Sequence, residues 1–98
     1  EGRLDVMKVD VEGAEPLVLA GASRAIATNP DLQIVMEWSP GQIRSAGFDV
    51  AAFLGELEAQ GLRFFALGHA NGGVAPVSAA DLLGTDYMAG ILLTARPR

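Results

Sequence analysis

The sequence contains no cysteine and only one histidine, one tryptophan and one tyrosine among its 98 residues. Without cysteine, the chain has no disulfide, no thiolate metal site and no cysteine nucleophile. It also has no apolar run of the roughly 18 residues that a membrane span needs, and no signal peptide. Zinc-ligand spacing and glycine-rich phosphate-binding or dinucleotide-binding patterns are absent. We therefore expect a cytoplasmic protein that does not enter a membrane.

Composition and charge indicate a single globular unit. Half of the residues are hydrophobic and 19% are charged, and seven basic against twelve acidic residues give a net charge of −5. This acidic balance argues against binding of nucleic acid through phosphate contacts and against docking on an anionic membrane. Because the chain begins at Glu1 and enters a strand-like pattern within a few residues, we interpret 1–98 as one partial domain.

The first half of the chain has the pattern of a strand, a helix and a second strand. Residues 4–11 are β-prone and end in acidic residues, and Gly13 allows a sharp turn. Apolar residues at helical spacing predict a helix over 17–27, with close packing or a bend at Gly21. The apolar segment 32–38 predicts a strand covered on both faces, which ends at Ser39, Pro40 and Gly41.

The second half continues this alternation. It predicts a helix over 50–60 and a strand with a short edge strand folded back on it over 62–77. A helical turn over 78–84 and a last strand over 88–95 follow. Asp49 caps the helix and Gly61 ends it, Asn71-Gly72 forms the hairpin turn, and Ser78 with Asp81 has capping-box spacing. The fold class is therefore α/β with a mostly parallel sheet whose last strand is antiparallel.

Acidic residues follow two of the predicted strands. Asp10 and Glu12 end the first strand and Glu37 lies in the second. An extended strand keeps Asp10 and Glu12 on one side, roughly 6.5 Å apart, and a neighbouring strand about 4.8 Å away brings Glu37 to the same crevice. Such carboxylates act as a general base, hold a hard cation or bind hydroxyl donors. The dipole of the following helix already accounts for Glu15.

Three further residues have a functional and a structural interpretation each. Trp38 serves as a lid or stacking surface beside Glu37, or packs in the core, which is the commoner role of a lone tryptophan. His69 acts as a proton shuttle or is an ordinary loop histidine, and the second is favoured. Lys8 pairs with a nearby acid or extends to the sheet edge.

The acidic block resembles the signature of FkbM-type methyltransferases, K-x-D-x-E-G-x-E followed by V-L-x-G. The matching residues are Lys8, Asp10, Glu12, Gly13, Glu15, Val18, Leu19 and Gly21. Residues 34–37 are similar to the hydrophobic strand ending in Glu in this family, and 87–95 are similar to its last strand.

The resemblance implies a class I, Rossmann-like fold with a seven-stranded sheet, of which this chain would be the C-terminal half, from the fourth strand to the seventh. It implies O-methylation by S-adenosylmethionine of a hydroxyl on a sugar or secondary metabolite. Asp10 and Glu12 would be catalytic, and Glu37 and Trp38 would contact the acceptor. No residue is assigned to the cofactor or to a metal. The glycine-rich loop that cradles the cofactor in this fold is not in the chain, so the fragment is expected to be inactive alone.

Two alternatives remain. The chain could be a non-catalytic α/β module that pairs with another chain, including a second copy, through an exposed sheet edge. It could also be a carboxylate–metal hydrolase that uses Asp10, Glu12 and Glu37. All catalytic interpretations require that Asp10 and Glu37 meet in one hollow at the same edge of the sheet.

Overall fold

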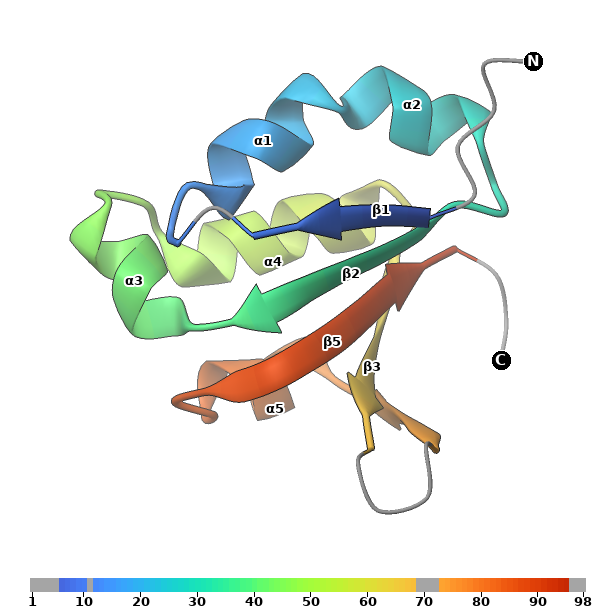
Figure 1. Ribbon diagram of the computed structural model, residues 1–98. Coiled ribbons are helices and arrows are strands. Elements are labelled where there is room, and N and C mark those ends of the chain that lie inside the picture. Colours follow the sequence, from blue (N-terminus) through green and yellow to red (C-terminus); the bar gives the residue numbers. More distant parts are fainter. Residues whose placement is uncertain (1–5, 11, 69–72, 96–98) are drawn as a thin grey trace.

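A computed structural model of the chain describes residues 6–10, 12–68 and 73–95. Strands and helices alternate along it, and Figure 1 shows their arrangement. The elements in chain order are β1 (Val6–Val9), α1 (Glu15–Gly21), α2 (Ser23–Thr28), β2 (Gln33–Trp38), α3 (Pro40–Ser45), α4 (Val50–Ala59), β3 (Arg63–Leu67), β4 (Val74–Val77), α5 (Ala79–Leu83) and β5 (Met88–Thr94).

The described strands form one sheet in the order β1-β2-β5-β3-β4. β1 and β2 are parallel, whereas β5 is antiparallel to both of its neighbours, β2 and β3. The α/β class and the antiparallel last strand are therefore confirmed. The expectation of a mostly parallel sheet is wrong, because β5 inserts between β2 and β3 and replaces a parallel contact with two antiparallel ones (Figure 1). The sheet is mixed.

The two faces of the sheet differ in what packs on them. Residues of all five helices join one hydrophobic cluster with alternate residues of the strands, among them Ile34, Met36 and Trp38 of β2. The intervening residues of β2, which include Val35 and Glu37, are only half-buried. Since successive side chains of a strand point to opposite faces, Glu37 lies on the face away from the helical layer.

The predicted capping residues lie at the helix ends and make the expected hydrogen bonds. The Asp49 side chain accepts a hydrogen bond from the backbone N–H of Ala52 at the start of α4. Ser78 and Asp81 form a capping box at the start of α5, with both reciprocal hydrogen bonds at 3.0 Å. Gly61 follows α4 with a φ of 89°, a conformation that favours glycine.

Helix boundaries differ from expectation at two places. The single helix expected over 17–27 is two helices, α1 and α2, which are separated at Ala22. A Cβ on Gly21 would have no neighbour within 4 Å, so the glycine marks a bend and not a close contact. The segment after β2, expected only to end the strand, continues into the helix α3. Pro40 fits there because it lies in the first turn of the helix, where its missing N–H costs nothing.

The predicted edge strand is also present. β4 pairs with β3 in antiparallel register at the edge of the sheet. The expected turn residues Asn71-Gly72, and His69 with its possible proton-shuttle role, lie outside the described residues.

Candidate functional site

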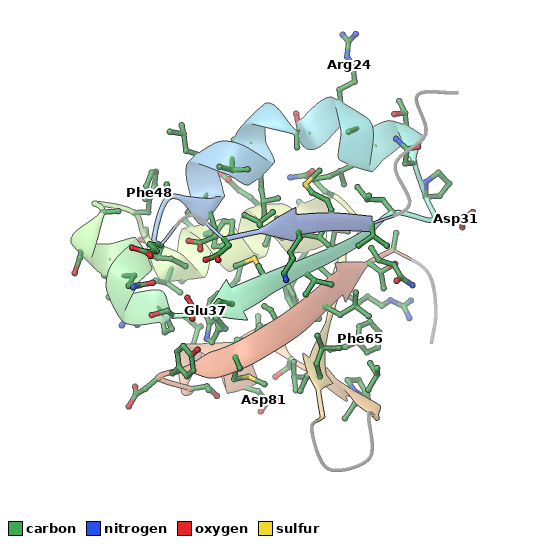
Figure 2. All side chains as sticks on the ribbon, in the orientation of Figure 1. Arg24, Asp31, Glu37, Phe48, Phe65 and Asp81 are labelled. Atoms are coloured by element: carbon green, nitrogen blue, oxygen red, sulfur yellow. The ribbon has the colours of Figure 1, made fainter. Side chains whose placement is uncertain are left out.

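Asp10 and Glu37 lie at the carboxyl ends of neighbouring parallel strands, on the same edge of the sheet. Val9, the last residue of β1, pairs with Met36 of β2, so Asp10 directly follows β1 and Glu37 is the penultimate residue of β2. Met36 faces the buried core, which directs Glu37 to the opposite face, and Asp10 lines the same hollow as Glu37. Figure 2 shows Glu37 at the end of β2.

The two carboxylates line a common hollow of about 220 Å³. Lys8, Val35 and Ala89 also line it, so one cation lies among the acidic groups. The sequence-based expectation that Asp10 and Glu37 share one hollow is therefore met by this geometry. The volume is below the roughly 300–1,000 Å³ of typical ligand pockets, so the hollow suits one polar group of a larger molecule.

Tyr87 completes this site from the loop that precedes β5. Its hydroxyl donates a hydrogen bond of 2.8 Å to Oε2 of Glu37. This hydrogen bond raises the pKa of Tyr87 above its ordinary value of 10.0, since ionisation would place a phenolate against the carboxylate. Loss of hydration and the negative charges of Glu37 and Asp10 act in the same direction. At neutral pH, Tyr87 is therefore a hydrogen-bond donor.

Glu12 does not join this hollow. β1 ends at Val9, and Glu12 itself has a φ of 50°, so the chain turns before it. Glu12 instead lines a separate hollow of about 630 Å³, together with Ser39 and Gln42. The expectation that Asp10 and Glu12 face one crevice is wrong, because it assumed that the strand stays extended through Glu12.

Glu15 has a structural role in this turn. Its side chain is buried, with 3% of its surface exposed, and Oε1 accepts a hydrogen bond of 2.9 Å from the backbone N–H of Gly13. The structural interpretation of Glu15 is thus supported, through a specific contact in addition to its place at the helix start.

Trp38 belongs to the core and not to the acceptor side of the site. Its side chain has no exposed surface, and Nε1 donates a hydrogen bond of 2.9 Å to the backbone carbonyl of Leu82. Glu37 and Trp38 are successive strand residues, so they point to opposite faces and cannot share one site. The expectation that Trp38 contacts the acceptor is therefore replaced by the core-packing alternative.

The site also bears on the metal-hydrolase alternative. Within residues 6–10, 12–68 and 73–95, no group of three His, Cys, Asp or Glu side chains has the spacing to hold a metal ion. The three carboxylates of that alternative are divided between two hollows.

None of the helices in the described part of the chain is both long and apolar enough to cross a membrane.

Comparison of the chain with protein-family models, with curated proteins and with solved structures gave no match. A functional interpretation therefore depends on the geometry of Asp10, Glu37 and Tyr87 and on the resemblance in the acidic block.

Proposed function

We propose that this chain is the C-terminal portion of an S-adenosylmethionine-dependent O-methyltransferase of the FkbM type. The observation that carries the proposal is the hollow shared by Asp10 and Glu37 at the carboxyl ends of two adjacent parallel strands. Ligands of open α/β sheets bind beyond these strand ends. The acceptor in this proposal is a hydroxyl group of a sugar or secondary metabolite.

The arrangement of the strands supports a position at the C-terminal side of a larger sheet. β1 is an edge strand of the described sheet and runs parallel to β2, so further parallel strands would pair along its other side. β5 is antiparallel, as the last strand of a class I methyltransferase would be. These features are compatible with the Rossmann-like class.

The chemistry of the hollow suits a hydroxyl. Asp10 is exposed at the edge of the hollow and can accept the hydroxyl proton, whereas Glu37 is held by Tyr87 and can orient the hydroxyl. S-adenosylmethionine, when bound, supplies the methyl carbon that the hydroxyl oxygen attacks. The hollow is too small to enclose that cofactor, so in this proposal residues preceding the chain hold most of it.

Methyl transfer by a chain extended upstream of Glu1 tests the proposal. The extended chain should bind S-adenosylmethionine in isothermal titration and transfer a labelled methyl group to at least one member of a panel of hydroxyl compounds. Asp10→Asn should lower kcat by about 10²-fold or more, because the proton acceptor is lost. Glu56→Gln is the matched control, because Glu56 is exposed on α4 away from the hollow and from the acidic block, and it should retain activity. A folded extended chain that binds no S-adenosylmethionine would reject the proposal.

The exposed edge of the sheet favours one other candidate, a non-catalytic module that pairs with another chain. Val6 on the edge strand β1 has 59% of its surface exposed, and the unpaired side of an edge strand is a template for association. Sedimentation and thermal melting of the 98-residue chain distinguish this candidate. A monomer that melts cooperatively removes its support.

A further inference from the structure

Tyr87 reaches the site because of an irregularity in the pairing of β2 with β5. Met36 pairs with Ile91 and Trp38 pairs with Met88, so two steps along β2 correspond to three along β5. The extra residue of β5 lies opposite Glu37. Such a bulge interrupts the ladder and redirects nearby side chains.

A small residue at the bulge leaves room beside Glu37. Ala89 occupies this part of β5 and lines the hollow, whereas the next residue, Gly90, packs against Leu67, whose Cδ1 would lie 3.2 Å from a Cβ at that position. Tyr87, which precedes the strand, is 55% exposed but places its hydroxyl 2.8 Å from Oε2 of Glu37. The space beside the hydrogen bond is therefore available to a ligand group.

The hydrogen bond engages one carboxylate oxygen of Glu37. A carboxylate has about four lone-pair positions on two oxygens, so Oε1 retains its capacity to accept a hydrogen bond. A phenol bonded to an ionised carboxylate forms a stronger contact than a neutral pair does, and it restricts rotation of the carboxylate group. Tyr87 thus sets the direction in which Glu37 can receive a donor.

We infer that Tyr87 is a positioning residue for the methyl acceptor. By holding Oε2 of Glu37, it presents Oε1 to the hydroxyl that is methylated. This inference rests on the proposed methyltransferase function. In the transfer, the bond from the methyl carbon to the sulfonium sulfur would break as the hydroxyl oxygen bonds to that carbon, S-adenosylhomocysteine would leave with the electron pair, and the hydroxyl proton would pass to Asp10. Tyr87 itself would neither gain nor lose a proton.

The groups that face Tyr87 and Glu37 come from each neighbouring strand. Lys8 and Asp10 come from β1 and its end, and both line the hollow with Glu37 of β2. The hydrogen bond to Glu37, together with the negative charges of Glu37 and Asp10, raises the pKa of the Tyr87 phenol above its ordinary value of 10.0, so the phenol stays a donor in mildly alkaline solution as well as at neutral pH.

The contact can be measured without any activity, because Tyr87 is the only tyrosine of the chain. Ultraviolet absorbance of the phenolate in the 98-residue chain then reports its ionisation alone. The wild type should ionise above the ordinary pKa of 10.0, and Glu37→Gln should move the titration to lower pH. Emission of Trp38, the only tryptophan, shows whether the core stays folded at each pH. Superimposable titrations of folded wild type and Glu37→Gln would overturn the inference.

The positioning role is measured in the extended chain with the panel compound that accepts methyl groups fastest. Tyr87→Phe should raise KM for that acceptor roughly tenfold, because Glu37 is no longer held in place and the charge-assisted hydrogen bond that the acceptor hydroxyl donates to its Oε1 is lost. The dissociation constant of S-adenosylmethionine should stay unchanged. A second substitution in the loop that precedes β5 should not restore the wild-type KM to the Tyr87→Phe variant. Unaltered KM and kcat in Tyr87→Phe would overturn the role.

The two measurements separate the inference from the function on which it rests. If the folded wild-type extended chain transfers no methyl group, the proposed function and the positioning role both fail. The absorbance titration still decides whether the Tyr87–Glu37 contact exists. If transfer occurs but Tyr87→Phe behaves as the wild type, only the positioning role fails.

Discussion

Gly13 provides the sharpest test of how the turn after β1 is built. It has a φ of 106°, and a Cβ at this position would lie 2.5 Å from the backbone carbonyl oxygen of Gln42 in α3. In Gly13→Ala, the backbone conformation costs about 1–2 kcal/mol and the forced contact about 1–3 kcal/mol, so the free energy of unfolding falls by about 2–5 kcal/mol. The backbone of Gln42 cannot move aside as the end of a flexible side chain could.

Gly61→Ala is the matched control. Gly61 has a similar φ of 89°, but a Cβ there would meet nothing within 4 Å, so only the conformational cost of about 1–2 kcal/mol applies. Urea unfolding followed by the emission of Trp38 measures both variants. In thermal unfolding, each 1 kcal/mol lost from the free energy of unfolding lowers Tm by about 4–8 °C for a domain of this size. Equal losses in the two variants would refute the close packing of the turn on α3.

Three further predictions concern single interactions. Asp49→Ala removes the cap of α4 and should lower the free energy of unfolding by about 1 kcal/mol in urea; unchanged stability would show that the cap contributes nothing. Trp38→Phe removes the hydrogen bond to the carbonyl of Leu82, which still accepts one of 3.1 Å from the N–H of Thr85, and should cost about 0.5–1.5 kcal/mol for that bond, measured by thermal melting followed by circular dichroism; a Tm equal to that of the wild type would contradict this. The pKa of Asp81 is lowered by hydrogen bonds from Ser78, so its stabilising effect is present above the ordinary pKa of 3.8 and is lost as the pH falls through the lowered value. Asp81→Asn should therefore flatten the acid limb of a plot of Tm against pH, and an unaltered limb would refute the contact.

The parts of the fold that could be predicted from the sequence are those determined by interactions between residues close together in the chain. The caps at Asp49 and Ser78 depend on hydrogen bonds that span three residues, so their side chains and spacing suffice to predict them. The position of β5 between β2 and β3 depends on pairing between distant segments, which no local pattern encodes. The mixed sheet was therefore missed.

The same distinction holds for the site. Asp10 and Glu37 could be predicted together because each ends a strand at the same sheet edge. Glu12 was misplaced because a positive φ at a residue other than glycine has no sequence signal here. The acceptor role of Trp38 was wrong and its core-packing alternative was right, which alternation with Glu37 along one strand already favoured. Tyr87 was missed because its contact joins residues that are 50 positions apart.

The central place of β5 has a consequence for how the protein is made. A ribosome releases the described strands in the order of the chain, so β2 and β3 both emerge before the strand that bridges them. Until β5 follows, each of them has an unsatisfied backbone edge, and such edges are prone to aggregate during synthesis. The sheet can close only after residue 94 has left the exit tunnel. Chaperones that shield nascent strands therefore matter more for this architecture than for one whose central strands are translated first.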